Sequence, residues 1–232
     1  MPQTADMTLH GVFMEILGLG VLVCGASGVG KGELALELVT RGHRLIADDA
    51  PEFHAAADGA PQGRCPPLLQ DRLEVRGLGV LNIRALFGAA AIAPQAVLAL
   101  KIHLQPNAVT RSLLKKAILG LFQHAKQKVR FLLCSIFQAP TPCLENGGAS
   151  LHRTQAVFQQ PASLHTLAPD YRTCTVLGRD IPEVTLPLRP GRNTALLIET
   201  LVRDFKLRRS GYDAAEDFAQ RQRDFMQRQR EA

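Results

Sequence analysis

The stretch of this sequence that points most directly to chemistry is Gly25-Ala26-Ser27-Gly28-Val29-Gly30-Lys31, which has the spacing G-x-x-x-x-G-K. Glycines adopt positive φ, so successive backbone N–H groups can converge on phosphate oxygens. A helix that starts here directs its positive end at the same anion. Lys31 adds a full charge for the outer phosphates. A glycine-rich turn that serves only close packing is the alternative, but the sequence context favours a phosphate loop.

The residue after the lysine is unusual for such a loop. It is Gly32, where a Ser or Thr hydroxyl normally binds Mg²⁺. A metal ligand is therefore missing, and water or nearby carboxylates would have to hold the ion. We expect nucleotide binding to survive this change better than catalysis.

Two adjacent acids, Asp48 and Asp49, follow a strand that we predict over residues 43–47. The end of a strand is the edge where ligands of open α/β sheets bind. Neighbouring residues of a strand point to opposite sides, so one acid would face the phosphates while the other braces the loop. Phosphoryl transfer to a hydroxyl needs such a carboxylate as base. A polar exit from the strand is the simpler alternative.

The elements that must position these residues alternate along the chain. Strands are predicted over residues 12–17, 21–24, 43–47, 96–104 and 184–188. The run at 21–24 is apolar throughout, as in a strand buried on both faces. A helix follows the glycine loop, with Leu34, Leu38 and Val39 on one face and Gly42 at its end. This order is typical of an α/β fold.

Two further helices are predicted near the carboxyl end. The first carries Leu197, Leu201 and Phe205 at intervals of four, and the second begins at Asp213 with a variant capping box. Residues 50–70 are rich in proline and are predicted to form a loop.

The composition narrows the class of protein. The chain has 232 residues, of which 46% are hydrophobic, and this permits a sizeable core. No apolar run approaches the roughly 18 residues of a membrane span, and no signal peptide opens the chain. The five cysteines are odd in number and lack C-x-x-C spacing, so neither disulfides nor structural zinc are expected. These features favour a cytoplasmic protein.

The positive charge is concentrated in one segment. Residues 75–169 hold ten Lys or Arg and a single acidic residue. The rest of the chain holds 17 Lys or Arg and 20 Asp or Glu. Within the basic segment, residues 114–129 have helical spacing with interleaved lysines. A basic amphipathic helix on a membrane or nucleic acid is one interpretation. The simpler one is an inserted segment over residues 107–168, docked on its own domain or without a selected fold.

Several stretches together resemble the catalytic domain of the HPr kinase/phosphorylase family. They are residues 9–12, 25–31, 41–49, 73–82, 86–88 and 187–193, and the resemblance covers about residues 8–104 and 170–225. Glu74-Val75-Arg76-Gly77-Leu78-Gly79 is far more specific than the phosphate loop alone. The resemblance implies an α/β fold: a P-loop-containing kinase core with a central mixed sheet flanked by helices, plus C-terminal helices.

The resemblance also implies roles for particular residues. His10, Lys31 and Asp49 match catalytic residues, with Asp49 accepting the proton of the target serine and returning one in reverse. Residues 25–32 match the ATP-binding loop, ending at Gly32, and Glu74 matches a Mg²⁺ ligand. The stretch tied to dephosphorylation comprises Pro187, Leu188, Arg189, Pro190, Gly191 and Arg192.

The activity implied is that of a bifunctional enzyme acting on the phosphocarrier protein HPr, which regulates carbon metabolism and the phosphotransferase system. It uses ATP and Mg²⁺ to phosphorylate a serine, and inorganic phosphate to remove that phosphoryl group as pyrophosphate. Family members form hexamers, and neither nucleic acid nor membrane is an implied partner.

The sequence departs from the family in three places. Gly32 replaces the metal-binding serine, and the family's N-terminal domain is expected to be absent, with the catalytic domain over residues 1–106 and 169–232. The family's catalytic arginine has no convincing match, since Arg153 and Arg172 are only the nearest candidates. A nucleotide-binding regulatory relic is therefore the alternative function, and Gly32→Ser would separate the two by restoring transfer to a relic.

Overall fold

The computed structural model describes residues 7–106 and 169–231, which lie in one of the two units into which the chain divides. The predicted basic helix and Arg153 lie outside the described residues. So does the predicted insertion over residues 107–168. None of the helices in the described part is long and apolar enough to span a bilayer.

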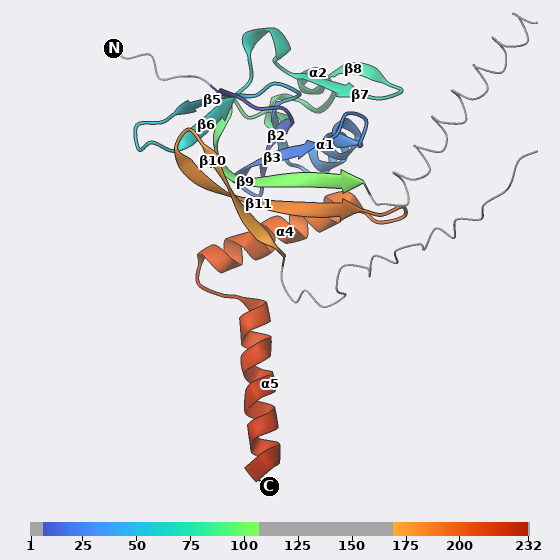
Figure 1. Ribbon diagram of the computed structural model, residues 1–232. Coiled ribbons are helices and arrows are strands. Elements are labelled where there is room, and N and C mark those ends of the chain that lie inside the picture. The colour runs from blue at the N-terminus through green and yellow to red at the C-terminus, as the bar shows by residue number, and fades with distance from the viewer. Residues whose placement is uncertain (1–6, 107–168, 232) are drawn as a thin grey trace, which may run out of the picture. The chain divides into compact units, whose positions relative to one another are not determined.

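A mixed sheet forms the centre of this unit (Figure 1). The order is β1-β5-β6-β9-β3-β2-β4, with β11 also beside β9 and β10 beside β11. Strand β9 runs parallel to β3 and β11, and the other pairings in this sheet are antiparallel. Its strands are β1 (Met7–Thr8), β2 (Val12–Ile16), β3 (Leu19–Gly25), β4 (Arg44–Ala47), β5 (Glu52–Ala55), β6 (Pro61–Arg64), β9 (Gln95–Pro106), β10 (Tyr171–Val176) and β11 (Arg179–Leu188).

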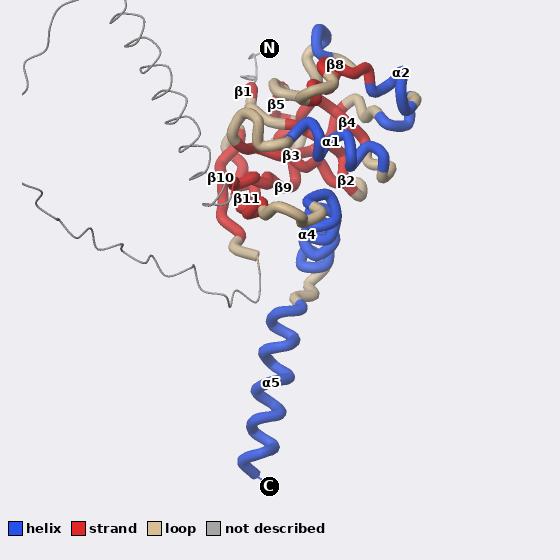
Figure 2. The backbone as a smooth tube through the Cα atoms, turned by 90° about the vertical axis from the view of Figure 1, so that its right-hand side faces the viewer, coloured by secondary structure: helices blue, strands red, loops and turns tan. Residues whose placement is uncertain are grey.

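The remaining elements lie around this sheet. A separate hairpin consists of β7 (Arg72–Val75) and β8 (Gly79–Asn82). The helices are α1 (Lys31–Thr40), α2 (Ile83–Phe87), α4 (Thr194–Arg209) and α5 (Ala214–Glu231), with 3₁₀ turns η1 (Pro67–Leu69) and η2 (Ala89–Ala91). Helices α1 and α4 cover the same face of the sheet (Figure 2). The α/β fold with a central mixed sheet is confirmed.

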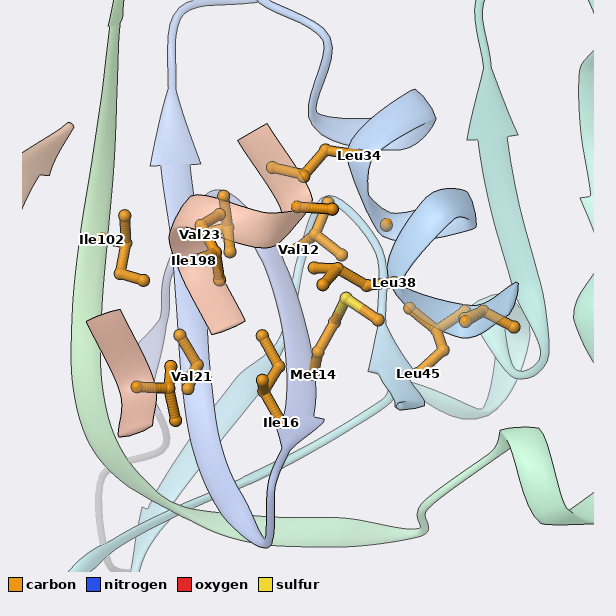
Figure 3. Close-up of a cluster of buried hydrophobic side chains, with 14 of the residues drawn as sticks. Val12, Met14, Ile16, Val21, Val23, Leu34, Leu38, Leu45, Ile102 and Ile198 are labelled. Carbon is orange, nitrogen blue, oxygen red and sulfur yellow. The ribbon is translucent and has the colours of Figure 1, made fainter. Parts of the chain in front are cut away.

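Alternating strand side chains build the core between the sheet and these two helices. Val12, Met14 and Ile16 of β2 point into it, where they meet Leu38 of α1 and Ile198 of α4 (Figure 3). Burying each such side chain contributes roughly 1.5–3 kcal/mol, so this cluster fixes α1 and the loop before it firmly on the sheet.

The opposite face of the sheet is also apolar. Phe13 of β2 and Leu22 of β3 are completely buried there, and Phe13 contacts Phe53 edge-on with ring centroids 5.1 Å apart. The prediction of a strand buried on both faces at residues 21–24 is therefore confirmed.

The prediction of a loop over residues 50–70 is wrong, because β5 and β6 form a hairpin there. Its prolines do not interrupt pairing, since Pro61 lies at the first position of β6, where a strand tolerates proline. Gly63 lies against the rings of Phe13 and Phe53, and a Cβ there would come within 2.6 Å of both. Packing of distant aromatic rings, rather than a local pattern, defines this hairpin.

The predicted strand over residues 184–188 is the second half of β11, which pairs with β9, and the first half of β11 forms a hairpin with β10. Leu177 and Gly178 connect the strands, with φ of 49° and 76°. Two positive φ values are typical of a type I′ turn, which usually carries Asn-Gly or Asp-Gly. Because Leu177 stands where Asn or Asp is usual, the sequence does not predict this turn.

A buried hydrogen bond connects α4 to the turn between α1 and β4. His43 Nε2 lies 2.8 Å from Glu199 Oε1, and both residues are only 7% exposed. Arg41 reaches the other oxygen of the same carboxylate at 3.4 Å. The contact joins a helix to a turn more than 150 residues earlier in the chain.

Candidate active site

The glycine loop lies between β3 and α1, as the sequence predicts. Strand β3 ends at Gly25, and Gly30 precedes the first residue of α1 with φ 97° and ψ 24°. Gly28 also has a positive φ, of 74°. Glycine adopts these angles without the steric cost that a Cβ would add, so the local structure follows directly from the residue types.

Lys31 folds back onto the loop. Its Nζ donates hydrogen bonds to the carbonyl oxygens of Gly25 at 3.1 Å and Ala26 at 3.4 Å. Among the residues that the structure describes, only these neutral carbonyl oxygens bind the ammonium group. A phosphate oxygen, which carries negative charge, is a stronger acceptor for the same group.

The two acids after β4 have different surroundings. Asp48 Oδ2 accepts a hydrogen bond of 2.8 Å from the backbone N–H of Glu74. Burial raises the pKa of the Asp48 carboxyl above its ordinary value, although this hydrogen bond opposes the shift. Asp48 thus joins the end of β4 to β7.

Asp49 points elsewhere because its backbone is left-handed, with φ 69°. Aspartate tolerates this conformation better than most residues. Its Oδ1 lies 2.9 Å from Nδ1 of His10, and the two side chains are 71% and 61% exposed. The pair is therefore open to a large substrate as well as to solvent.

His10 is positioned through its backbone. It precedes β2, and its carbonyl oxygen accepts a weak hydrogen bond from Cys24 Sγ at 3.3 Å. The next residue, Gly11, donates its N–H to the Asp49 carbonyl at 3.2 Å. Contacts from β3 and from the β4 exit thus place the imidazole beside the glycine loop.

These segments enclose a cavity of about 130 Å³. Four residues singled out from the sequence, His10, Lys31, Asp49 and Glu74, line it together. The other lining residues are Ser27, Gly28, Gly30, Gly32, Glu33, Asp48 and Arg76, so Gly25, Ala26 and Val29 of the loop do not face it.

The residues present do not fit the implied Mg²⁺ site. Gly32 has no hydroxyl, and a Cβ at this position would lie 2.1 Å from the carbonyl oxygen of Glu74. Strand β7 therefore occupies the space that a serine side chain needs. Among the described residues, no group of three or more His, Cys, Asp or Glu side chains is arranged to hold a metal ion. Glu74 alone remains of the expected protein ligands.

The stretch over residues 187–192, which the sequence predicts to serve dephosphorylation, borders a second cavity of about 290 Å³. Leu188 and Arg192 line it on one side, and Gly30 and Glu33 line it on the other. Because Gly30 and Glu33 also line the first cavity, the two are neighbours. Pro187, Arg189, Pro190 and Gly191 line neither.

The resemblance ties residues 73–82 to both activities but assigns no role to Arg76 itself. Arg76 lies in the turn between β7 and β8 and lines the first cavity. The sequence signal that pointed to Arg76 was its position inside the family-specific stretch over residues 74–79. Arg172, the candidate for the missing arginine, instead pairs with Asp170 at 3.4 Å and lines neither cavity.

The fold and the site define a phosphate-loop α/β protein in which a histidine–aspartate pair faces the loop. The chain belongs to the family of the HPr Serine kinase C-terminal domain, whose profile matches residues 3–126 and 154–222. The predicted family is thus confirmed.

Similar proteins agree with this assignment. The HPr kinase/phosphorylases of Xanthomonas campestris pv. campestris (strain B100) and Xanthomonas oryzae pv. oryzae (strain PXO99A) are each 40% identical over 222 residues. The match covers 96% of this chain and 55% of each relative, so the chain spans about half their length. The solved Hpr(Ser) kinase/phosphatase from Coxiella burnetii superposes with a TM-score of 0.64 at 28% identity, covering 91% of this chain and 98% of that one.

Proposed function

We propose that this chain is the catalytic domain of a bifunctional HPr serine kinase/phosphorylase that uses ATP as phosphoryl donor. The observation that carries the proposal is the convergence of the glycine loop, Lys31 and the His10–Asp49 pair on one cavity. Relatives at 40% identity are named for both activities. We also propose a cytoplasmic location and a homo-oligomer, the hexamer of the family, with neither nucleic acid nor membrane as partner.

In the forward direction, the backbone N–H groups of Ser27, Gly28 and Gly30, which line the cavity, and the Lys31 ammonium bind the polyphosphate of ATP. Asp49 accepts the proton of the HPr serine hydroxyl as its oxygen attacks the γ-phosphorus. The bond from that phosphorus to the β-bridging oxygen breaks, and ADP leaves. His10, 2.9 Å from Asp49, orients the carboxylate toward the incoming hydroxyl.

In the reverse direction, a hydroxyl oxygen of inorganic phosphate attacks the phosphorus of phosphoserine, and Asp49 accepts the proton of that hydroxyl. The phosphorus–serine bond breaks, pyrophosphate forms, and Asp49 passes the proton on to the serine oxygen. The same residue serves both directions because forward and reverse reactions share related transition states. Arg192, which borders the neighbouring cavity, is a phosphate-binding group suited to this direction.

Gly32 and the neighbouring Glu74 carbonyl leave the expected Mg²⁺ site incomplete. The ion would supply charge neutralisation and in-line alignment of the transferring phosphoryl group where it is bound.

A transfer assay on the purified chain tests the proposal. HPr is incubated with ATP, and phosphoserine is measured by intact-protein mass spectrometry; phosphorylated HPr is then incubated with phosphate, and pyrophosphate is measured. We expect both products with wild type and neither with Lys31→Ala. ATP binding without either product would favour the regulatory-relic alternative.

A further inference from the structure

Arg76 lies directly against the phosphate loop. If Gly28 carried a Cβ, that atom would lie 2.7 Å and 2.8 Å from the two terminal guanidinium nitrogens of Arg76. The guanidinium group is therefore in contact with the main chain of the loop, at a residue that itself lines the cavity.

The positive charge of Arg76 has no partner in the described residues. It makes no hydrogen bond or ion pair there, whereas Arg44, Arg84 and Arg208 all pair with carboxylates. The four carboxylates that share its cavity, Glu33, Asp48, Asp49 and Glu74, form no ion pair with it. An unpaired guanidinium beside anion-binding amides is suited to a phosphate, which it can bind through two parallel hydrogen bonds.

The same hairpin also leaves no room for the side chain at position 32 that normally binds Mg²⁺, the usual positive charge at such a site. The Glu74 carbonyl lies where a side chain at position 32 would have to begin, 2.1 Å from the ideal Cβ. The loss of the metal-binding hydroxyl is thus part of how β7 packs on α1 rather than an isolated change of one residue. Arg76, two residues after Glu74 in the same hairpin, lies against the phosphate loop at Gly28.

We propose that Arg76 is a polyphosphate-binding residue and that, together with Lys31, it neutralises the nucleotide so that ATP binds without Mg²⁺. This inference rests on the proposed function, since it takes the cavity to be the nucleotide site. Arg76 supplies a guanidinium on the Gly28 side of the loop, and Lys31 supplies an ammonium on the Gly25 side. Two cations that contact one triphosphate offset part of its charge.

Calorimetric titration of the full chain with ATP tests the inference, once in excess Mg²⁺ and once in EDTA. We expect the wild-type Kd to differ by less than about threefold between the two conditions. Arg76→Gln should weaken ATP binding by about tenfold or more in both, as loss of a charge-assisted hydrogen bond does. ADP binding should weaken less, because fewer phosphates remain to be neutralised.

Arg72→Gln is the matched control, since Arg72 is exposed on the same hairpin and does not line the cavity. It should leave the Kd within about twofold of wild type. Arg76→Lys keeps the charge but loses the planar pair of donors, so it should fall between wild type and Arg76→Gln.

Two results would overturn the inference alone: loss of wild-type ATP binding in EDTA, or an unchanged Kd in Arg76→Gln. Absence of ATP binding under both conditions would overturn the proposed function together with it.

Discussion

The carboxylate of Asp48 accepts a hydrogen bond from the backbone N–H of Glu74 at 2.8 Å, and so it joins the exit of β4 to the β7–β8 hairpin. The adjacent Asp49 turns away and contacts His10 instead. Two neighbouring acids therefore have separate environments, one half-buried at a joint between elements and one exposed beside His10. They should respond differently to the same substitution.

Asp48→Asn should change how stability depends on pH. Burial raises the pKa of Asp48 in the folded state, so its contribution to stability is fully present below the unfolded pKa of about 3.9 and is lost as pH rises through the higher folded value. Asparagine does not titrate and keeps an acceptor for the Glu74 N–H. The variant should therefore gain stability relative to wild type between about pH 4 and pH 7.

Urea unfolding at several pH values measures this difference. Asp170→Asn, which alters an exposed ion pair, is the control and should show little pH-dependent gain. A difference that stays constant or reverses sign with pH would contradict the described environment of Asp48.

Glu199→Ala should destabilise the fold by about 3 kcal/mol, because it leaves the buried His43 without its partner. Glu37→Ala, which breaks an exposed pair on α1 with Arg41, should cost less than about 1 kcal/mol. The free energy of unfolding in urea distinguishes the two. Equal losses would mean that the contact between α4 and the α1–β4 turn is not a specific anchor.

Gly32→Ser and Gly32→Ala should behave alike. Both add a Cβ that meets the Glu74 carbonyl, so both should lose about 1–3 kcal/mol of stability and perturb the loop. The serine hydroxyl should bring no recovery of Mg²⁺-dependent transfer over alanine. Transfer at least tenfold faster in the serine variant would show that β7 yields to the new side chain and that the site accepts a metal ligand.

Cys24 and Cys65 should resist alkylation in the folded protein. Burial raises the pKa of both thiols to about 11, which leaves about one molecule in a thousand as thiolate at pH 8. Iodoacetamide labelling followed by peptide mass mapping checks this, with the urea-unfolded chain as reference. Labelling of Cys24 at similar rates in both states would contradict its place beneath His10.

The sequence alone predicted the parts of the fold that local patterns encode. Continuous apolar residues identified β3, alternation identified β9, and glycines at fixed spacing identified the loop. Each of these signals arises within a few residues, because burial on a pleated strand or a positive φ constrains the residue type directly.

The remainder depended on contacts between distant segments. The β5–β6 hairpin rests on aromatic packing from β2, and the turn at Leu177 lacks the usual residues. Spacing alone did not distinguish the two adjacent acids, and only the family resemblance assigned the proton to Asp49. A left-handed backbone at Asp49 is what sets its side chain beside His10. Arg76 contacts Gly28 across two loops that are distant in the sequence, and no local residue pattern predicts such a contact.

The central claim is that Asp49 moves the proton during transfer while the glycine loop binds the nucleotide. Asp49→Asn keeps the shape of the side chain and removes its basicity. Phosphoserine formation on HPr and ATP affinity should be measured side by side on the same preparation. We predict that transfer falls by about 10²–10⁴-fold while the Kd for ATP stays within about threefold of wild type. Transfer at the wild-type rate in Asp49→Asn would contradict the account.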